Sequence, residues 1–178
     1  VVHVSWADAA AYAAWAGRGL PSEAQWECAA RGGLDRRRYP WGDELEPGGE
    51  HRMNVWQGGF PSRNTQDDGW YGTSPADTFP PNDYGLRNMT GNVWEWCADW
   101  LDVNASVSQD SVDPTGPSDG DLRVLKGGSF LCHASYCARY RPAACMGLPP
   151  DSSTSNVGFR CSRPGIGPAL PGKVADQG

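Results

Sequence analysis

The sequence predicts a single compact α+β domain with little regular secondary structure. Two helix patterns near the start, a few short strand-like runs further on, and a composition rich in turn residues lead to this class. The 178 residues include 23 glycines, 15 prolines and 9 tryptophans. Glycine and proline at this density indicate many turns, and tryptophan side chains can anchor long loops because each buries a large apolar area. The chain is long enough for one domain with its own core.

Two helices are predicted at the start of the chain. The first begins after Ser5, which forms a capping-box pattern with Asp8, and the second begins after Ser22, whose capping partner is Gln25. Glycines end both runs, at Gly17 and at Gly32-Gly33. One face of the first helix predicts close packing against a flat partner, through Trp6, Ala9, Ala10, Ala13 and Ala14.

Regular periodicity fades after the second helix. Short strands are expected at residues 92–96, 122–125 and 158–161. Residues 1–163 are expected to form the domain, and residues 164–178 a flexible tail. The opening VVHVSW has no signal-peptide pattern and reads as if it starts inside a domain. We therefore expect an N-terminal portion to be missing.

Charge and hydropathy exclude two classes of partner. The formal net charge is -6 and the isoelectric point is near 4.9, whereas nucleic-acid binding needs a basic face. The mean hydropathy is -0.57, and no apolar run approaches the length of a membrane span. We expect neither nucleic acid nor a membrane as a partner.

Six cysteines are spread along the chain, at positions 28, 97, 132, 137, 145 and 161. Their spacings do not match a structural zinc pattern, and a disulfide-dense secreted scaffold fits a chain of this length poorly. The isolated Cys28 and Cys97 are expected to be buried small hydrophobes.

Cys132 and Cys137 carry the most chemical information. They lie five positions apart around a histidine and a tyrosine, and such a spacing puts two side chains on different faces of a helix. Convergent thiols would therefore need a turning backbone. The pair could form a disulfide, hold a soft metal, or act as a nucleophile with its resolving partner.

Seven motifs extend over nearly the whole chain. They are LPSEAQWE (20–27), RGG (31–33), PWG (40–42), NVWQGGFP (54–61), FPPNDYGLRNMTGNVWEW (79–96), GGSFLCHASYC (127–137) and DSSTSNVGFRC (151–161). In these motifs the chain resembles the formylglycine-generating enzyme family, also called sulfatase-modifying factors, from His3 to about Ser162. GNVWEW and GFR are shared by a wider superfamily that includes binding modules and iron enzymes. The cysteine pair inside GGSFLCHASYC is what resembles the generating enzyme itself.

The resemblance implies a fold and an activity. The fold would be the family's C-type-lectin-like catalytic domain, with low regular secondary-structure content. The activity would be that of an oxidoreductase that uses molecular oxygen to convert the cysteine of a Cys-x-Pro-x-Arg motif in an unfolded sulfatase into Cα-formylglycine. Cys132 and Cys137 would hold copper(I), which is soft and prefers thiolates. A plain disulfide is the alternative for this pair.

Five further residues match positions that the family places around the thiols. Ser129, His133 and Trp94 would belong to the catalytic site, and Tyr136 and Asn156 would shape the substrate groove. Ser129 could hydrogen-bond a thiolate or an oxygen-derived species. His133 could instead be a satisfied structural residue, and Trp94 could be core.

The resemblance also implies two structural calcium ions. Calcium prefers six to eight oxygen ligands, and the matching residues lie in oxygen-rich loops. The first would be held by Asn54, the carbonyl of Val55, Asp68 and the carbonyl of Trp70, and the second by Asn88, Gly91, Val93 and Glu95. The alternative is that these residues cap turns. Asn88-Met89-Thr90 also matches a glycosylation sequon, which we reject because a ligand role would bury Asn88.

Two disulfides found in eukaryotic relatives cannot form here. The matching positions are Ala13 with Cys161, and Ala30 with Pro142. A chain without these bridges is compatible with a reducing compartment, so we expect a bacterial cytoplasmic protein rather than one of the endoplasmic reticulum or a secreted one. We also expect a monomer.

Two other functions remain open at this point. One is a non-catalytic module of the same fold that binds a sulfatase or another peptide. The other is an iron-dependent sulfoxide synthase of the ergothioneine type, which needs a histidine-rich site. The chain has three histidines, His3, His51 and His133.

Overall fold

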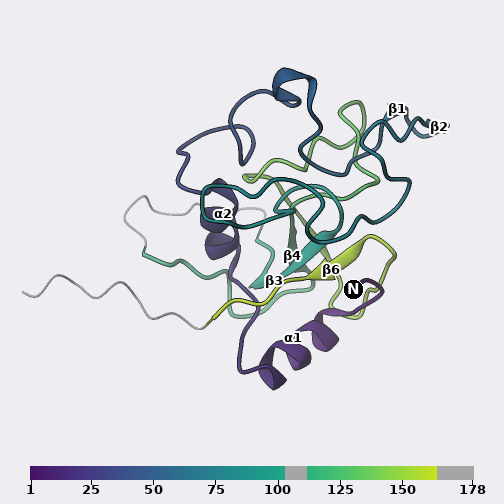
Figure 1. The fold of residues 1–178 in the computed structure, drawn as a ribbon. Coiled ribbons are helices and arrows are strands. Elements are labelled where there is room, and N and C mark those ends of the chain that lie inside the picture. The colour runs from purple at the N-terminus through teal and green to yellow at the C-terminus, as the bar shows by residue number, and fades with distance from the viewer. Residues whose placement is uncertain (103–111, 164–178) are drawn as a thin grey trace, which may run out of the picture.

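Short elements joined by long loops make up the molecule (Figure 1). The structure, a computed structural model, describes residues 1–102 and 112–163. The helices are α1 (Trp6–Trp15), α2 (Glu23–Arg31) and the 3-10 helix η1 (Pro47–Gly49). The strands are β1 (Gly58–Gly59), β2 (Arg63–Asn64), β3 (Trp94–Trp100), β4 (Arg123–Lys126), β5 (Cys145–Leu148) and β6 (Val157–Phe159). This content confirms the predicted α+β class; the predicted tail lies outside the described residues.

The main sheet has four strands in the order β5-β4-β3-β6. The pairs β5-β4 and β4-β3 are antiparallel, whereas β3 and β6 run parallel and align Trp94 with Val157. Because β3 is central, Trp96 and Cys97 are fully buried. The parallel pair brings the residues just before β6 beside the start of β3.

The three predicted strands overlap β3, β4 and β6. The two-residue strands β1 and β2 were missed, and so was β5 of the main sheet. Its sequence, CMGL, is short, contains Gly147 and shows no alternation of burial along the strand. A Cβ atom on Gly147 would lie 2.9 Å from Leu122 Cβ and 2.7 Å from Leu101 Cδ2, so close packing favours a glycine here although glycine is unfavourable in strands. Close packing here overrides the local preference.

Both predicted capping boxes are present. Ser5 Oγ accepts a hydrogen bond from the Asp8 amide at 3.2 Å, and the Ser5 amide donates to Asp8 Oδ2 at 3.0 Å. Ser22 and Gln25 make the equivalent pair at the start of α2. The helices therefore begin where the sequence predicts.

The packed face of α1 is narrower than predicted. Ala9 and Ala13 are completely buried, and the indole of Trp6 donates to the Cys97 carbonyl of β3 at 2.8 Å. Ala14, however, is exposed. It lies one residue, or about 100°, around the helix from Ala13, which turns it towards solvent.

All six cysteines are free, and the two isolated ones differ in burial. Cys97 is fully buried, as predicted. Cys28 is exposed, so its predicted burial is wrong. α2 buries Trp26 and Ala30, and Cys28 lies two residues from each of them, on the opposite face of the helix.

Among the described residues, no helix has the length and apolar character needed to cross a bilayer.

Candidate functional site

Cys132 and Cys137 lie on a turn that follows β4. The Cys132 amide donates to the Ser129 carbonyl at 2.8 Å, and the Cys137 amide donates to the His133 carbonyl at 2.8 Å. These successive turns bring the two Sγ atoms to 3.4 Å, while both thiols remain free. The turning backbone predicted for convergent thiols is therefore present.

Two glycines lead from β4 into this turn. Gly127 and Gly128 have φ angles of 93° and 75°, which side-chain-bearing residues rarely adopt. A Cβ atom on Gly128 would lie 2.8 Å from the Cα atom of Tyr140. The GG of the GGSF motif is therefore a backbone requirement that lets the turn pack against residue 140.

The two thiols differ in exposure. Cys132 is 3% exposed and belongs to the main core cluster, whereas Cys137 is half-buried. Burial, reinforced by the neighbouring Cys137 sulfur, raises the pKa of the Cys132 thiol to about 12. Without a cation beside it, Cys132 is therefore protonated at neutral pH.

Three other predicted site residues meet beside the turn. Asn156 Nδ2 donates to Ser129 Oγ at 3.1 Å, and the Asn156 carbonyl accepts from the Trp94 amide at 2.8 Å. Ser129 is fully buried, and Trp94 lies in the same core cluster as Cys132. The parallel pairing of β3 and β6 makes this arrangement possible because it places Asn156 next to Trp94.

An aromatic cluster covers the remaining two predicted residues. The ring of Phe60 stacks on His133, with centroids 6.1 Å apart, and on Tyr136, with centroids 5.0 Å apart. His133 Nδ1 shares a hydrogen bond with Ser135 Oγ at 2.7 Å, and Tyr136 is 75% exposed. Phe60 was missed in the sequence analysis, although it lies in the NVWQGGFP motif.

The thiol pair fits a two-coordinate soft cation better than a larger metal centre. Over residues 1–102 and 112–163, no group of three or more histidine, cysteine, aspartate or glutamate side chains could hold a metal ion. Cys132 and Cys137 would therefore supply two sulfur ligands, the set that copper(I) accepts. The same finding gives no support to a histidine-rich iron site in the described residues.

The first predicted calcium set converges around Asp68. Its two carboxylate oxygens accept hydrogen bonds from the amides of Val55 and Trp70, both at 3.0 Å, and burial raises its pKa. Asn54 is 1% exposed, and its Oδ1 atom has no hydrogen-bond partner. The unpartnered, buried Asn54 oxygen is what a missing ligand would leave. The Val55 carbonyl, however, accepts a hydrogen bond from Gln57 Nε2 at 3.2 Å, so this set fits a calcium ion only in part.

The second predicted set is only partly open to a cation. Asn88 has a buried Oδ1 atom without a partner. Glu95, however, accepts hydrogen bonds from the Trp26 indole at 2.6 Å and from Arg160 Nε and Nη2 at 2.5 and 2.7 Å. Arg160 also donates to the Asn88 carbonyl at 3.2 Å. The arginine of the GFR motif, which the sequence analysis did not assign to the site, therefore supplies the positive charge at Glu95.

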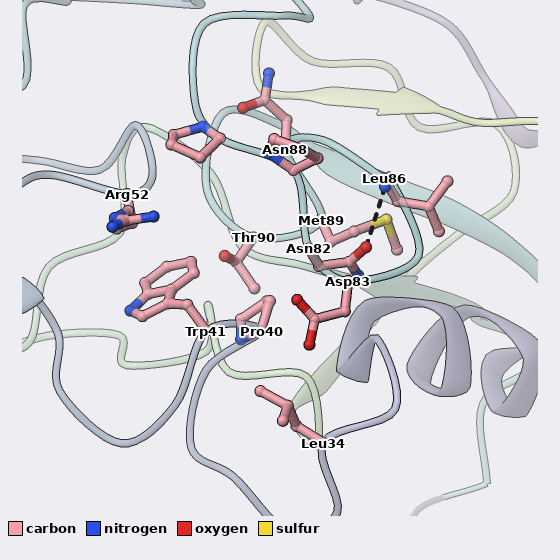
Figure 2. A pocket seen from close by; sticks show the side chains of 12 residues that line it. Leu34, Pro40, Trp41, Arg52, Asn82, Asp83, Leu86, Asn88, Met89 and Thr90 are labelled. Atoms are coloured by element: carbon pink, nitrogen blue, oxygen red, sulfur yellow. Dashed lines mark hydrogen bonds between the residues drawn. The ribbon is translucent and has the colours of Figure 1, made fainter.

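Asn88 is one of the residues that line a cavity of about 310 Å³. Figure 2 shows the side chains of Arg52, Trp41 and Thr90 around it, with Asn88 at one end. Arg52 Nε is buried there without a hydrogen-bond partner. The cavity can admit water or a hydrated ion next to Asn88, and neither thiol lines it.

Comparison with known proteins agrees with this fold. Residues 1–164 match the model of the sulfatase-modifying factor enzyme 1-like domain. Among solved structures, PvdO from Pseudomonas aeruginosa is similar with a TM-score of 0.70 and 27% identity, over 89% of this chain and 59% of that one. The fold and the thiol-bearing turn thus place the molecule among the sulfatase-modifying-factor folds, and the chain belongs to the sulfatase-modifying factor enzyme 1-like family.

The similar proteins include some named formylglycine-generating enzymes and some named inactive. The formylglycine-generating enzyme of Thermomonospora curvata is 61% identical over 165 residues, which are 91% of this chain and 54% of that protein. The protein named inactive C-alpha-formylglycine-generating enzyme 2 of Mus musculus is 47% identical over 91% of this chain and 48% of its own length. The chain spans about half the length of the curated relatives that it matches.

Proposed function

We propose that this protein oxidises a cysteine in a Cys-x-Pro-x-Arg segment of an unfolded sulfatase to Cα-formylglycine, with molecular oxygen as the oxidant. The observation that carries this proposal is the convergence of two free thiols, 3.4 Å apart, on one turn. The family includes a relative named inactive, so membership alone does not decide the activity. The thiol pair is the feature that favours catalysis over a binding module.

Copper(I) is the proposed cofactor, with Cys132 and Cys137 as its ligands. When bound there, it would keep both sulfurs deprotonated and supply one-electron chemistry with oxygen. This chain's part is to bring the two sulfurs together and to surround Cys132 with apolar side chains, which exclude water from the site.

The residues beside the turn have separate proposed roles. Ser129, held by Asn156 and fully buried, would present a hydroxyl next to the thiols for a hydrogen bond to the reacting sulfur or to oxygen. Trp94 would form a wall of the site. Tyr136, which is largely exposed, would contact the peptide as it lies across the turn in an extended conformation.

The overall reaction balances with one further reactant. In the net reaction, the substrate thiol, one molecule of oxygen, and two electrons and two protons from a thiol reductant in solution give the aldehyde, hydrogen sulfide and one molecule of water. The modified peptide therefore loses about 18 Da, the mass of hydrogen sulfide less that of one oxygen atom.

Mass spectrometry of a synthetic peptide tests the proposal. The full-length protein, supplied with copper(I), oxygen and a thiol reductant, should lower the mass of a Cys-x-Pro-x-Arg peptide by about 18 Da. Cys132→Ser and Cys137→Ser should each reduce turnover by orders of magnitude, because a serine hydroxyl replaces a soft thiolate. Cys28→Ser is the control, since this exposed cysteine lies on α2.

The same experiment separates the second candidate, a peptide-binding module. A module would bind the peptide without changing its mass, and its binding would survive both serine substitutions at the turn. Full turnover by Cys132→Ser and Cys137→Ser would instead show that the thiols have no part in the reaction.

A further proposal is that the protein works in a bacterial cytoplasm. All six cysteines are free, which is compatible with a reducing compartment such as a bacterial cytoplasm.

We also propose that calcium binds at Asn54 and Asp68, where the unpartnered Asn54 oxygen supports the site. The set around Glu95 has weaker support because Arg160 already pairs with that carboxylate.

A further inference from the structure

Phe60 contacts both residues that flank the thiols within the turn. His133 directly follows Cys132, and Tyr136 directly precedes Cys137. The Phe60 ring is nearly parallel to both, at 6° to the His133 ring and 16° to the Tyr136 ring. One side chain from a distant part of the sequence therefore packs against each cysteine's neighbour.

The segment that carries Phe60 also holds the backbone of the turn. Phe60 lies between β1 and β2, and its ring packs edge-on against Trp56, with centroids 5.4 Å apart and an interplanar angle of 81°. The Trp56 amide donates to the Cys132 carbonyl at 3.0 Å. Trp56 and Phe60, before and after β1, thus contact the turn at Cys132, His133 and Tyr136.

These contacts matter because the core holds only the first part of the turn: Ser129 and Cys132 are buried, whereas Cys137 is only half-buried. Residues 129–137 belong to no strand or helix, and Tyr136 is 75% exposed. Aromatic pairs of this kind attract each other beyond the effect of the apolar area that they bury. Loss of both stacks would leave the backbone on either side of the thiols free to sample other conformations.

We propose that Phe60 is a positioning residue that sets the separation of the Cys132 and Cys137 sulfurs through its stacks on His133 and Tyr136. Its effect on catalysis rests on the proposed function. Its effect on the thiol pair does not, because the equilibrium between two thiols and one disulfide depends directly on how closely the sulfurs are held.

The first measurement is therefore a redox titration in glutathione buffers. In this reaction the two thiols pass two electrons and two protons to one oxidised glutathione, which leaves one Cys132–Cys137 disulfide and two reduced glutathione molecules. Phe60→Ala should lower the equilibrium constant for this disulfide about tenfold, which corresponds to about 30 mV. Rapid alkylation followed by peptide mapping distinguishes this pair from the other four cysteines.

Three variants make the titration decisive. Phe60→Tyr retains the ring and should keep the wild-type equilibrium, whereas Phe60→Leu keeps apolar volume without the flat ring and should shift it in the same direction as alanine. If Phe60→Ala does not fold, Phe60→Leu decides. Phe79→Leu is the control, because Phe79 is a buried ring, 5% exposed, in another loop. A change of less than twofold in Phe60→Ala and in Phe60→Leu, or an equal shift in Phe79→Leu, would overturn the proposal.

The second measurement separates positioning from substrate contact. If Phe60 acts through the thiols, Phe60→Leu should lower kcat for the Cys-x-Pro-x-Arg peptide several-fold and leave KM within about twofold. An increase in KM alone would assign Phe60 to the peptide-binding surface and overturn the positioning role. A wild-type protein without turnover would refute the proposed function, while the glutathione titration would still test Phe60.

Discussion

At the scale of single residues, the thiol site depends on positions that carry no chemistry themselves. Gly128 has a positive φ of 75° and lies against the Tyr140 backbone, so the chain can enter the cysteine turn only if residue 128 lacks a Cβ atom. The side-chain amide of Asn156 also helps to place the site, because it donates a hydrogen bond to the Ser129 hydroxyl. The reactive groups are therefore placed by neighbours on other segments.

Gly128→Ala is expected to destabilise the protein by about 1–3 kcal/mol, because alanine disfavours the positive φ and its Cβ atom would overlap residue 140. Denaturant unfolding measures this cost. Gly72→Ala is the matched control, since a Cβ atom there meets nothing within 4 Å and its φ is not positive. Equal stability of the two variants would contradict the role assigned to Gly128.

The residue scale also shows what sequence reasoning could reach. The thiol pair was singled out by its chemistry and spacing, and Ser129 and Asn156 because they match positions that the resembled family places around the thiols. Phe60 and Arg160 were missed because a phenylalanine or an arginine gains its role here from contacts with segments far away in the chain. Local patterns do not encode such contacts.

At the scale of elements, local rules predicted the helices better than the strands. Helix starts are set by side-chain to backbone hydrogen bonds within four residues, so Ser5 and Ser22 could be recognised directly. β5 depends instead on its partner β4 and on the packing of Gly147 against Leu101. A strand whose existence depends on its neighbours leaves a weak pattern in its own sequence.

The cap of α1 predicts a pH effect. The Ser5 hydroxyl and the Ser5 amide both donate to the Asp8 carboxylate, and they hold its pKa below the usual 3.8. Because the folded pKa is lowered, the stabilisation is present above the unfolded pKa and is lost as pH falls through the folded value. NMR titration should therefore find Asp8 below 3.8 in the wild type.

Two substitutions at Ser5 check this assignment. Ser5→Ala should move the Asp8 midpoint up towards its ordinary value, because the hydroxyl donor is lost. Ser5→Thr keeps the hydroxyl and should retain the low pKa. A midpoint that does not change in Ser5→Ala would show that the cap has no influence on the carboxylate.

At the scale of the whole molecule, a few buried polar groups connect the loops to the sheet. Arg160 follows β6 and pairs with Glu95 of β3, and the same carboxylate accepts the indole proton of Trp26 on α2. Arg160 also donates to the carbonyls of Arg87 and Asn88 in the loop before β3. One ion pair thus joins a helix, two strands and a loop.

Arg160→Ala is expected to destabilise the fold by about 3–5 kcal/mol, because it leaves the Glu95 carboxylate buried without its cation. Urea unfolding should show the loss, and Arg63→Ala, at an exposed position on β2, serves as control. Adding Glu95→Gln to Arg160→Ala should recover part of the stability. A double variant no better than Arg160→Ala alone would contradict this explanation.

Calcium at Asn54 and Asp68 predicts a second effect on global stability. Binding to the native state alone contributes about 2.7 kcal/mol at a free calcium concentration one hundred times Kd. Chelation should therefore lower the melting temperature by several degrees. Asp68→Asn should abolish most of this shift, whereas Asp67→Asn, at the exposed neighbouring position, should leave it intact. An identical shift in both variants would remove Asp68 from the ligand set.

The parallel pairing of β3 with β6 has a consequence for the timing of assembly. Asn156, which holds Ser129 beside the thiols, reaches its place only when β6 has paired with β3. β6 is the final strand of the described chain, so during synthesis the cysteine turn leaves the ribosome before the residues that complete its surroundings. The newly made protein therefore carries both thiols outside their folded surroundings for a short period, and during that period the fold does not shield them from other chains.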